Sequence, residues 1–133
     1  MSTNTDYVVF VKAPVNVDGV DIFNATPHPI SFGVGDEVVE VPTNMIINAT
    51  ATEETVTTKN GVEYVRTTFK GNDLGREQIA AIREACPDGV IVGSIIAAQA
   101  YPGEVVAMTP LPGFERVPPA EKRMNPHKFT TFE

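Results

Sequence analysis

Short runs of apolar residues, many of them β-branched or aromatic, dominate the first third of the chain and predict strands. These runs cover residues 7–12, 20–23, 30–32 and 37–41. The last two runs flank Gly33-Val34-Gly35-Asp36, where glycines suit a tight reversal that needs positive φ. We therefore predict two strands followed by a hairpin.

Asn60-Gly61 is the clearest turn signal in the sequence, because Asn-Gly is typical of the two-residue turn of a β-hairpin. It lies between residues 45–58, which are rich in Ile, Val and Thr, and the β-prone residues 62–69. Both arms of this hairpin are long. We expect it to project from the core or to form an oligomer contact.

The apolar period changes after this hairpin and predicts one amphipathic helix of about three turns. Apolar residues recur at i, i+3 and i+7, at Ile79, Ile82 and Cys86. Asn72 or Asp73 can supply the N-cap, and Pro87 lies just past the expected end. Both boundaries of the helix therefore have a physical cause.

Residues 89–109 predict a strand, a helix and a second strand. Residues 89–92 are apolar and lead into Gly93-Ser94, and the alanines of the run 95–101 favour helix over strand. Residues 104–109 complete the unit. A strand-helix-strand order favours a crossover connection with a parallel strand pair. We expect this unit to cover one face of the antiparallel part.

The last segment of the chain has little periodicity and holds five prolines among residues 110–133. We predict an extended tail at 113–133, anchored on its own domain or on a second copy by aromatic residues, with a solvated tail as the alternative. The aromatic anchors are Phe114, Phe129 and Phe132. The predicted fold is thus α+β, a single β-rich domain at 1–112 followed by the tail.

Charge and composition restrict the function. Seventeen acidic and ten basic residues give a formal charge of −7, which disfavours broad nucleic-acid binding but not a small anion held by local donors. One cysteine and two histidines exclude disulfide frameworks and four-ligand zinc clusters within the chain, so we expect no metal or cofactor. The start of the chain lacks signal-peptide features and no run spans a membrane, which predicts a cytoplasmic protein.

The densest candidate site is Asn24-Ala25-Thr26-Pro27-His28-Pro29. Prolines at 27 and 29 push Thr26 and His28 toward extended backbone, which presents their side chains at little further entropic cost. Asn24, Thr26 and His28 are groups that can bind a ribose, a base edge or a phosphate. The alternative is a polar turn in which these side chains satisfy local backbone groups.

A second candidate is Gly93-Ser94, where a strand is predicted to run into a helix. The free N–H groups at a helix start can hold an anion, but small residues at such a junction also serve tight packing. Arg66 and Arg76 can each reach a phosphate, with surface ion pairing as the alternative. These four residues complete the predicted ligand-binding set.

No catalytic motif is visible. Ser31 or Ser94 could be combined with His28 and an aspartate into a hydrolytic triad, but no spacing supports it. Cys86 continues the apolar stripe of the predicted helix and is expected in the core. We therefore expect a protein that is not an enzyme.

Two segments of the chain stand out together: 21–30, Asp-Ile-Phe-Asn-Ala-Thr-Pro-His-Pro-Ile, and 89–100, Gly-Val-Ile-Val-Gly-Ser-Ile-Ile-Ala-Ala-Gln-Ala. They resemble segments of small phage and prophage proteins that are largely uncharacterised. In that group an early Asn-Leu-Thr-Pro-His segment precedes a Val-Ser-x-Leu-Val-Ala-x-Ala segment. The resemblance anchors most of residues 21–110, and the chain departs from it at Ala25, where leucine is usual. It implies a viral or mobile-element origin, in a host cytoplasm.

A small acidic phage protein without a catalytic motif is typical of accessory factors that bind and block host components, and by analogy of those that sequester nucleotide immune signals. The leading hypothesis is therefore a homo-oligomeric accessory protein that sequesters a small phosphate-bearing ligand without catalysis. The second hypothesis is a protein-interaction module that uses the 45–69 hairpin and the tail. The third is a hydrolase.

Overall fold

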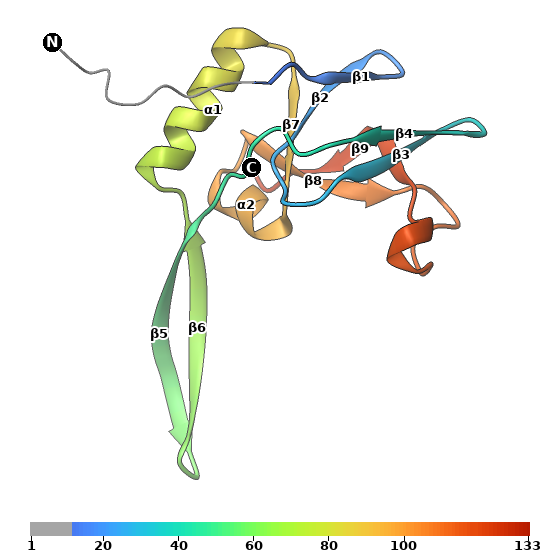
Figure 1. Ribbon diagram of the computed structural model, residues 1–133. Coiled ribbons are helices and arrows are strands. Elements are labelled where there is room, and N and C mark those ends of the chain that lie inside the picture. Colours follow the sequence, from blue (N-terminus) through green and yellow to red (C-terminus); the bar gives the residue numbers. More distant parts are fainter. Residues whose placement is uncertain (1–11) are drawn as a thin grey trace, which may run out of the picture.

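A seven-stranded mixed sheet forms the body of the protein, and the computed structural model describes residues 12–133 of the chain (Figure 1). Its strands are β1 (Val15–Val17), β2 (Val20–Asn24), β3 (Ile30–Val34), β4 (Glu37–Val41), β7 (Val90–Gly93), β8 (Val105–Pro110) and β9 (Met124–Thr130). The order across the sheet is β1-β2-β7-β8-β9-β3-β4. β2, β7 and β8 run parallel to one another, as do β9 and β3, and the other neighbours are antiparallel.

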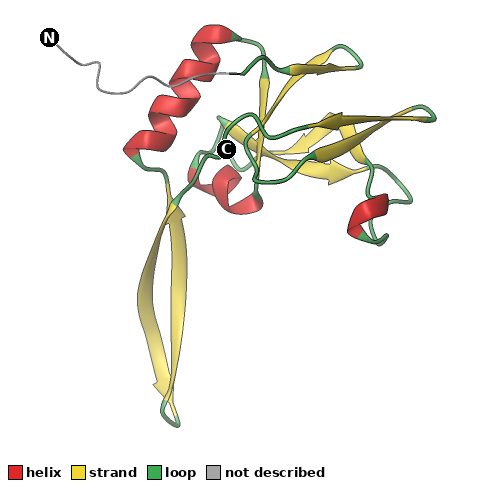
Figure 2. Ribbon diagram, in the orientation of Figure 1, coloured by secondary structure: helices red, strands yellow, loops and turns green. Residues whose placement is uncertain are grey.

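Two helices, α1 (Asp73–Ala85) and α2 (Ile95–Ala100), pack on one face of this sheet (Figure 2). They bury Ile79, Ile82, Ala97 and Ala98 against Phe23, Ile91, Val105 and Ala107. The other face curls over a second core, made by Val17, Ile22, Ile30, Phe32, Val41 and Val92. Successive strand residues point to opposite faces, so Phe23 enters the first core and Ile22 the second.

Most locally encoded elements form where the sequence predicts them. The 30–41 hairpin is β3 and β4, and the amphipathic helix is α1, with Asn72 as its N-cap through a bond from the Gly75 amide. The strand-helix-strand unit is β7, α2 and β8, with β7 parallel to β8. The coarse prediction of a single β-rich domain with hairpins and few helices is therefore confirmed.

Two differences lie near the start of the chain. The sequence predicts a strand at 7–12, but residues 1–11 lie outside the described part and Lys12 has no regular structure. β1 was not predicted. It pairs with β2 across Asp18-Gly19, where both residues have positive φ, at 48° and 88°, as a type I′ turn requires.

The Asn60-Gly61 hairpin is present as β5 (Thr50–Lys59) and β6 (Val62–Lys70), with φ of 52° and 77° at the two turn residues. We call residues 50–70 the arm. It forms a sheet of its own and stands out from the body (Figure 1). The predicted start at Met45 is too early, because residues 45–49 cover the first core, where Ile47 is buried.

The segment predicted as a tail contributes a strand to the interior of the sheet. Instead of leaving the domain at residue 113, the chain turns through a 3₁₀ helix, η2 (Pro119–Glu121), and returns as β9 between β8 and β3. Phe129, one of the expected anchors, packs edge-on against Phe32, with ring centroids 6.4 Å apart. The division at residue 112 is therefore not a boundary in the fold.

Among residues 12–133, no helix is long and apolar enough to cross a bilayer. The longest, α1, has 13 residues, whereas a transmembrane helix needs about 20.

Candidate functional site

Asn24 ends β2 and organises the loop that follows it. Its side chain is fully buried, and its amide nitrogen donates to the carbonyl oxygens of His28, at 2.8 Å, and Val41, at 2.9 Å. Its amide oxygen accepts from the backbone N–H and the hydroxyl of Thr26, at 2.8 and 2.6 Å. Both donors and both acceptor positions of the amide are thus occupied.

This bond set joins the loop to the far edge of the sheet. The bond to Val41 connects the end of β2 to the end of β4, and the backbone carbonyl of Asn24 accepts from the Asn44 amide at 2.8 Å. Asn24 therefore holds the curl of the sheet closed. The sequence predicted a ligand-binding side chain here, but a buried amide with no spare hydrogen-bonding group supports the turn alternative instead.

The rest of the loop presents His28 to solvent. Thr26 is only 7% exposed, and its hydroxyl lies 2.9 Å from the His28 carbonyl oxygen. Pro27, His28 and Pro29 are exposed, and within residues 12–133 no hydrogen bond reaches the His28 imidazole. The hydrogen-bonded loop therefore exposes the His28 imidazole to solvent, and the two ring nitrogens are available to a ligand.

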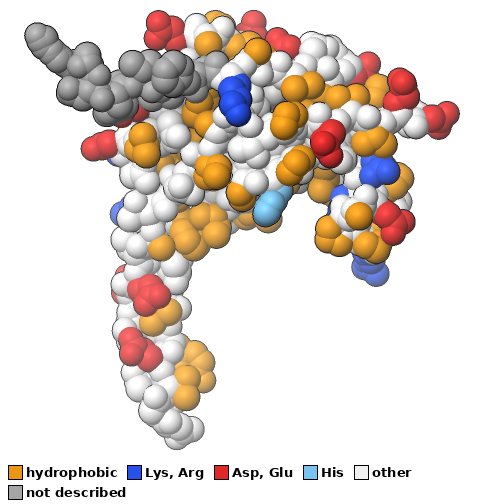
Figure 3. Space-filling model, viewed as in Figure 1, with side chains coloured by type: hydrophobic (Ala, Val, Ile, Leu, Met, Phe, Trp, Pro, Cys, Tyr) orange, Lys and Arg blue, Asp and Glu red, His pale blue; other side chains and the backbone are white. Residues whose placement is uncertain are grey.

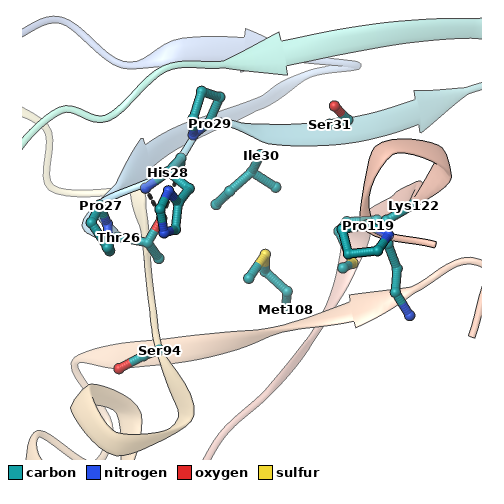
Figure 4. A pocket seen from close by; sticks show the side chains of 11 residues that line it. Thr26, Pro27, His28, Pro29, Ile30, Ser31, Ser94, Met108, Pro119 and Lys122 are labelled. Carbon is teal, nitrogen blue, oxygen red and sulfur yellow. Dashed lines mark hydrogen bonds between the residues drawn. The ribbon is translucent and has the colours of Figure 1, made fainter.

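A pocket of about 450 Å³ lies next to this loop (Figure 4). Its apolar floor comes from the adjacent strands β3, β8 and β9, through Ile30, Met108 and Met124. Its rim is formed by Thr26, Pro27, His28, Pro29, Ser31, Ser94, Pro119 and Lys122. We call this cavity the His28 pocket.

The parallel pairing of β2 with β7 brings the two predicted segments together. Asn24 lies opposite Val92, and the Ala25 amide donates to the Val92 carbonyl at 2.8 Å. Because parallel strands end at the same edge of a sheet, the residues that follow them emerge side by side. His28 and Ser94 therefore line one pocket, although 66 positions separate them.

Gly93 and Ser94 have different roles. A Cβ on Gly93 would lie 2.6 Å from Val105 Cγ1 and 3.1 Å from Ala97 Cβ, so packing between β8 and α2 requires glycine. Ser94 caps α2 through a bond from the Ala97 amide to its hydroxyl, and it is an exposed residue of the pocket lining. With only six residues, α2 is too short for its end dipole to hold an anion, so the predicted anion site reduces to the Ser94 hydroxyl.

The two predicted arginines lie outside the His28 pocket. Arg66 is exposed on β6 of the arm, opposite Glu54. Arg76 is on α1, where its side chain is 59% exposed and pairs with Asp73 at 2.8 Å. Neither residue lines the pocket, and the Arg76 geometry matches the surface ion pair given above as the alternative.

Lys122 is the cation that sequence reasoning missed. It lies at the opposite end of the pocket from His28 (Figure 4), and its ammonium donates to the Glu115 carbonyl at 2.7 Å and the Phe114 carbonyl at 3.5 Å. An ammonium has three donors, so one N–H is left for a ligand. The sequence predicts residues 113–133 as a tail outside the domain and therefore does not bring Lys122 to this pocket.

The geometry does not assemble a hydrolytic triad. Ser31 and Ser94 line the pocket with His28, but no hydrogen bond joins either hydroxyl to the imidazole within residues 12–133, and no carboxylate is among the lining residues. In the same part of the chain, no group of three or more His, Cys, Asp or Glu side chains could hold a metal ion. What the pocket offers is an apolar floor with hydrogen-bond donors around it.

Comparisons with protein-family models, with curated proteins and with solved structures gave no match to this chain.

Proposed function

We propose that this protein binds a small phosphate-bearing ligand in the His28 pocket and holds it without chemical change. The observation that carries the proposal is the exposed His28 imidazole, fixed by the Asn24 bond set at the rim of an apolar cavity. A volume of about 450 Å³ suits a small organic molecule. Sequestration in the host cytoplasm is proposed by analogy with small phage accessory factors, since the resemblance itself implies an origin rather than an activity.

The lining favours a ligand with two chemically different parts. Met108 and Met124 supply polarizable sulfur in the floor, which makes favourable contacts with a flat ring such as a nucleobase. His28 and Lys122 lie at opposite ends of the rim, so each supplies a donor for an anionic group at its own end of the pocket. A nucleotide carries both parts. These local donors act at contact range, where the overall charge of −7 matters less than hydrogen-bond geometry.

Replacement of His28 by alanine is expected to weaken nucleotide binding at least about tenfold, because one hydrogen bond to a charged group contributes about 1.5–3 kcal/mol. Isothermal titration calorimetry with cyclic dinucleotides, ADP-ribose and nucleoside monophosphates measures this change, and nucleosides without phosphate test the anionic part. His127→Ala is the matched control, since His127 pairs with Asp18 and does not line the pocket. Equal affinity of the His28→Ala variant would remove His28 from the site, and conversion of the nucleotide would contradict binding without catalysis.

A protein-interaction module is the second candidate function, and the exposure of the arm favours it. Deletion of residues 114–133 is unsuitable as its test, because this deletion removes β9 from the sheet. Replacement of residues 52–68 by a short Gly-Ser turn leaves the body intact. A partner retained by the full chain and lost from the shortened one supports this function.

A further inference from the structure

The arm exposes more apolar surface than a solitary ribbon normally does. All residues of β5 and β6 are exposed except the half-buried Phe69. Four large apolar side chains are among the exposed ones: Val56 at 54%, Val62 at 53%, Tyr64 at 50% and Val65 at 42%. Figure 3 shows hydrophobic side chains along the arm, away from the body. A two-stranded hairpin alone is at best marginally stable in water, so such an arm gains stability from a further surface.

The charge distribution favours a second copy of this chain as that surface. Residues 50–70 hold three acids, Glu53, Glu54 and Glu63, and three bases, Lys59, Arg66 and Lys70. The arm is therefore neutral, and the whole formal charge of −7 lies outside it. Two copies that met through their bodies would bring like charges together, whereas contact through the arms keeps those charges apart.

The two outer edges of the arm differ in regularity. The pairing of β5 with β6 shifts register between Thr55 and Thr57, so Val56 is an extra residue in β5. A bulge of this kind bends a strand and discourages further pairing at its edge. β6 has no such interruption between Val62 and Lys70. The open edge of β6 is therefore the one able to accept another strand.

Hydrogen-bond direction restricts the register. In a hairpin with a two-residue turn, Lys59 and Val62 bond to each other, and the bonded positions then alternate along the strand. Glu63, Val65 and Thr67 consequently direct their backbone groups outward. When β6 pairs antiparallel with β6 of a second copy, outward residues of the two strands lie opposite each other. The two-fold axis that relates the two copies then passes through a residue rather than between two residues.

Charge selects among these axes. An axis at Val65 places Arg66 opposite Tyr64 of the second copy, where a guanidinium can stack on the ring, and Glu63 opposite Thr67. An axis at Arg66 would place the Arg66 side chains of the two copies opposite each other, with like charges. An axis at Tyr64 would leave Glu63 opposite Val65 and Arg66 opposite Val62. Of these three axes, the one at Val65 sets a group of the second copy that can contact the charge opposite both Glu63 and Arg66, in addition to Thr55 and Glu54 of their own chain.

We propose that two copies of this chain associate through their arms, with β6 pairing antiparallel to β6 of the second copy about a two-fold axis at Val65. The two hairpins then form one four-stranded sheet. Each copy contributes β6, a strand of nine residues, to the pairing, and β5 lies on the outer side of β6. This inference is independent of the His28 pocket.

Sedimentation equilibrium of the full chain tests the association. The expected mass is twice 14.3 kDa. Val65→Arg sets two like charges opposite each other at the axis and is expected to raise the dimer dissociation constant at least about tenfold. Thr58→Arg is the matched control: Thr58 is exposed on β5, away from the β6 edge, and should leave the dimer unchanged. A monomeric wild type, or a dimer that Val65→Arg does not weaken, overturns the proposal.

Cysteine crosslinking tests the register in a Cys86→Ser background. A residue on the two-fold axis faces its own copy at about 5.5 Å between Cα atoms, within disulfide range. Val65→Cys is therefore expected to form an intermolecular disulfide under mild oxidation, and Thr58→Cys is not. Efficient crosslinking at position 58, or none at 65 in a sample of dimeric mass, overturns the register.

Discussion

Replacing Asn24 with alanine is expected to lower the free energy of unfolding by about 3 kcal/mol or more, because each buried polar group left without a partner costs about 1–3 kcal/mol. The substitution leaves the Val41 carbonyl oxygen without its donor and the Thr26 backbone N–H without its acceptor, whereas the His28 carbonyl oxygen keeps the Thr26 hydroxyl at 2.9 Å. The end of β2 also loses its connection to β4. Urea unfolding followed by circular dichroism measures the loss.

Asn16→Ala is the control for that measurement. Asn16 also makes two side-chain hydrogen bonds within a turn, to Asp21 and from Gly19, but both are exposed. Water replaces exposed partners, so a loss of about 1 kcal/mol or less is expected. If the two substitutions cost the same, the Asn24 bond set does not hold the fold as inferred.

Aspartate at position 24 adds a pH signature to the same experiment. Its carboxylate would be buried facing two carbonyl oxygens, so folding raises the pKa of this carboxyl above its unfolded value of about 3.9. At a pH well below about 3.9 the carboxyl is protonated in both states, and one O–H donor survives. As the pH rises toward 7 the unfolded state ionises first, so the variant loses stability progressively. If Asn24→Asp lowers the free energy of unfolding by the same amount at pH 4 and pH 7, the carboxyl at position 24 is not buried against the two carbonyl oxygens.

Gly75→Ala is expected to lower the free energy of unfolding by about 2 kcal/mol. Helix propensity alone predicts the opposite, an increase of about 1 kcal/mol. Gly75 is buried in α1, and a Cβ there would overlap the Tyr101 hydroxyl and lie 2.5 Å from Tyr101 Cζ. That hydroxyl donates to the Asn48 carbonyl at 2.7 Å and accepts from the Asn72 amide at 3.0 Å. Thermal unfolding reports the change.

A double-mutant cycle isolates this clash. Tyr101→Ala removes the ring, so adding Gly75→Ala in that background should stabilise α1 by about the propensity difference. Ala80→Gly, at an exposed position of the same helix, sets the size of that difference. A stabilising Gly75→Ala in the wild-type background would show that the ring moves aside without loss.

Elements encoded by a few neighbouring residues were predictable from the sequence. Asn60-Gly61 specifies its turn through positive φ, and Asn72 specifies the start of α1 through one hydrogen bond. From the sequence alone, the convergence of the His28 and Ser94 segments is only a hypothesis. It depends on the alignment of β2 with β7, which pairs residues about 68 positions apart.

β9 was not predictable from local pattern, because Pro126 interrupts a run that otherwise resembles a strand. The proline is tolerated because the β8–β9 pairing is irregular between Met108 and Pro110, and β3 pairs with β9 only at Phe32 and Met124. The missing N–H therefore falls in an interrupted part of the ladder. Without β9, neither Lys122 nor Met124 could be assigned to the pocket.

The position of Asn24 also could not be deduced from its residue type. An asparagine beside a threonine and two prolines fits an exposed recognition loop as well as a buried turn. The curl of the sheet decides between them, since it brings the Val41 carbonyl to the Asn24 amide. His28, two positions beyond Thr26, escapes this burial and keeps its imidazole in the rim.

The interior location of β9 sets an order on the biosynthesis of the protein. In the folded sheet, residues 124–130 lie between β3 and β8. Until the ribosome has translated this segment, each of the two strands has an edge without a hydrogen-bonded neighbour. The nascent chain likewise lacks Met124 in the pocket floor. A chain released before this point therefore keeps the edges of β3 and β8 unpaired, and it is expected to be prone to aggregation.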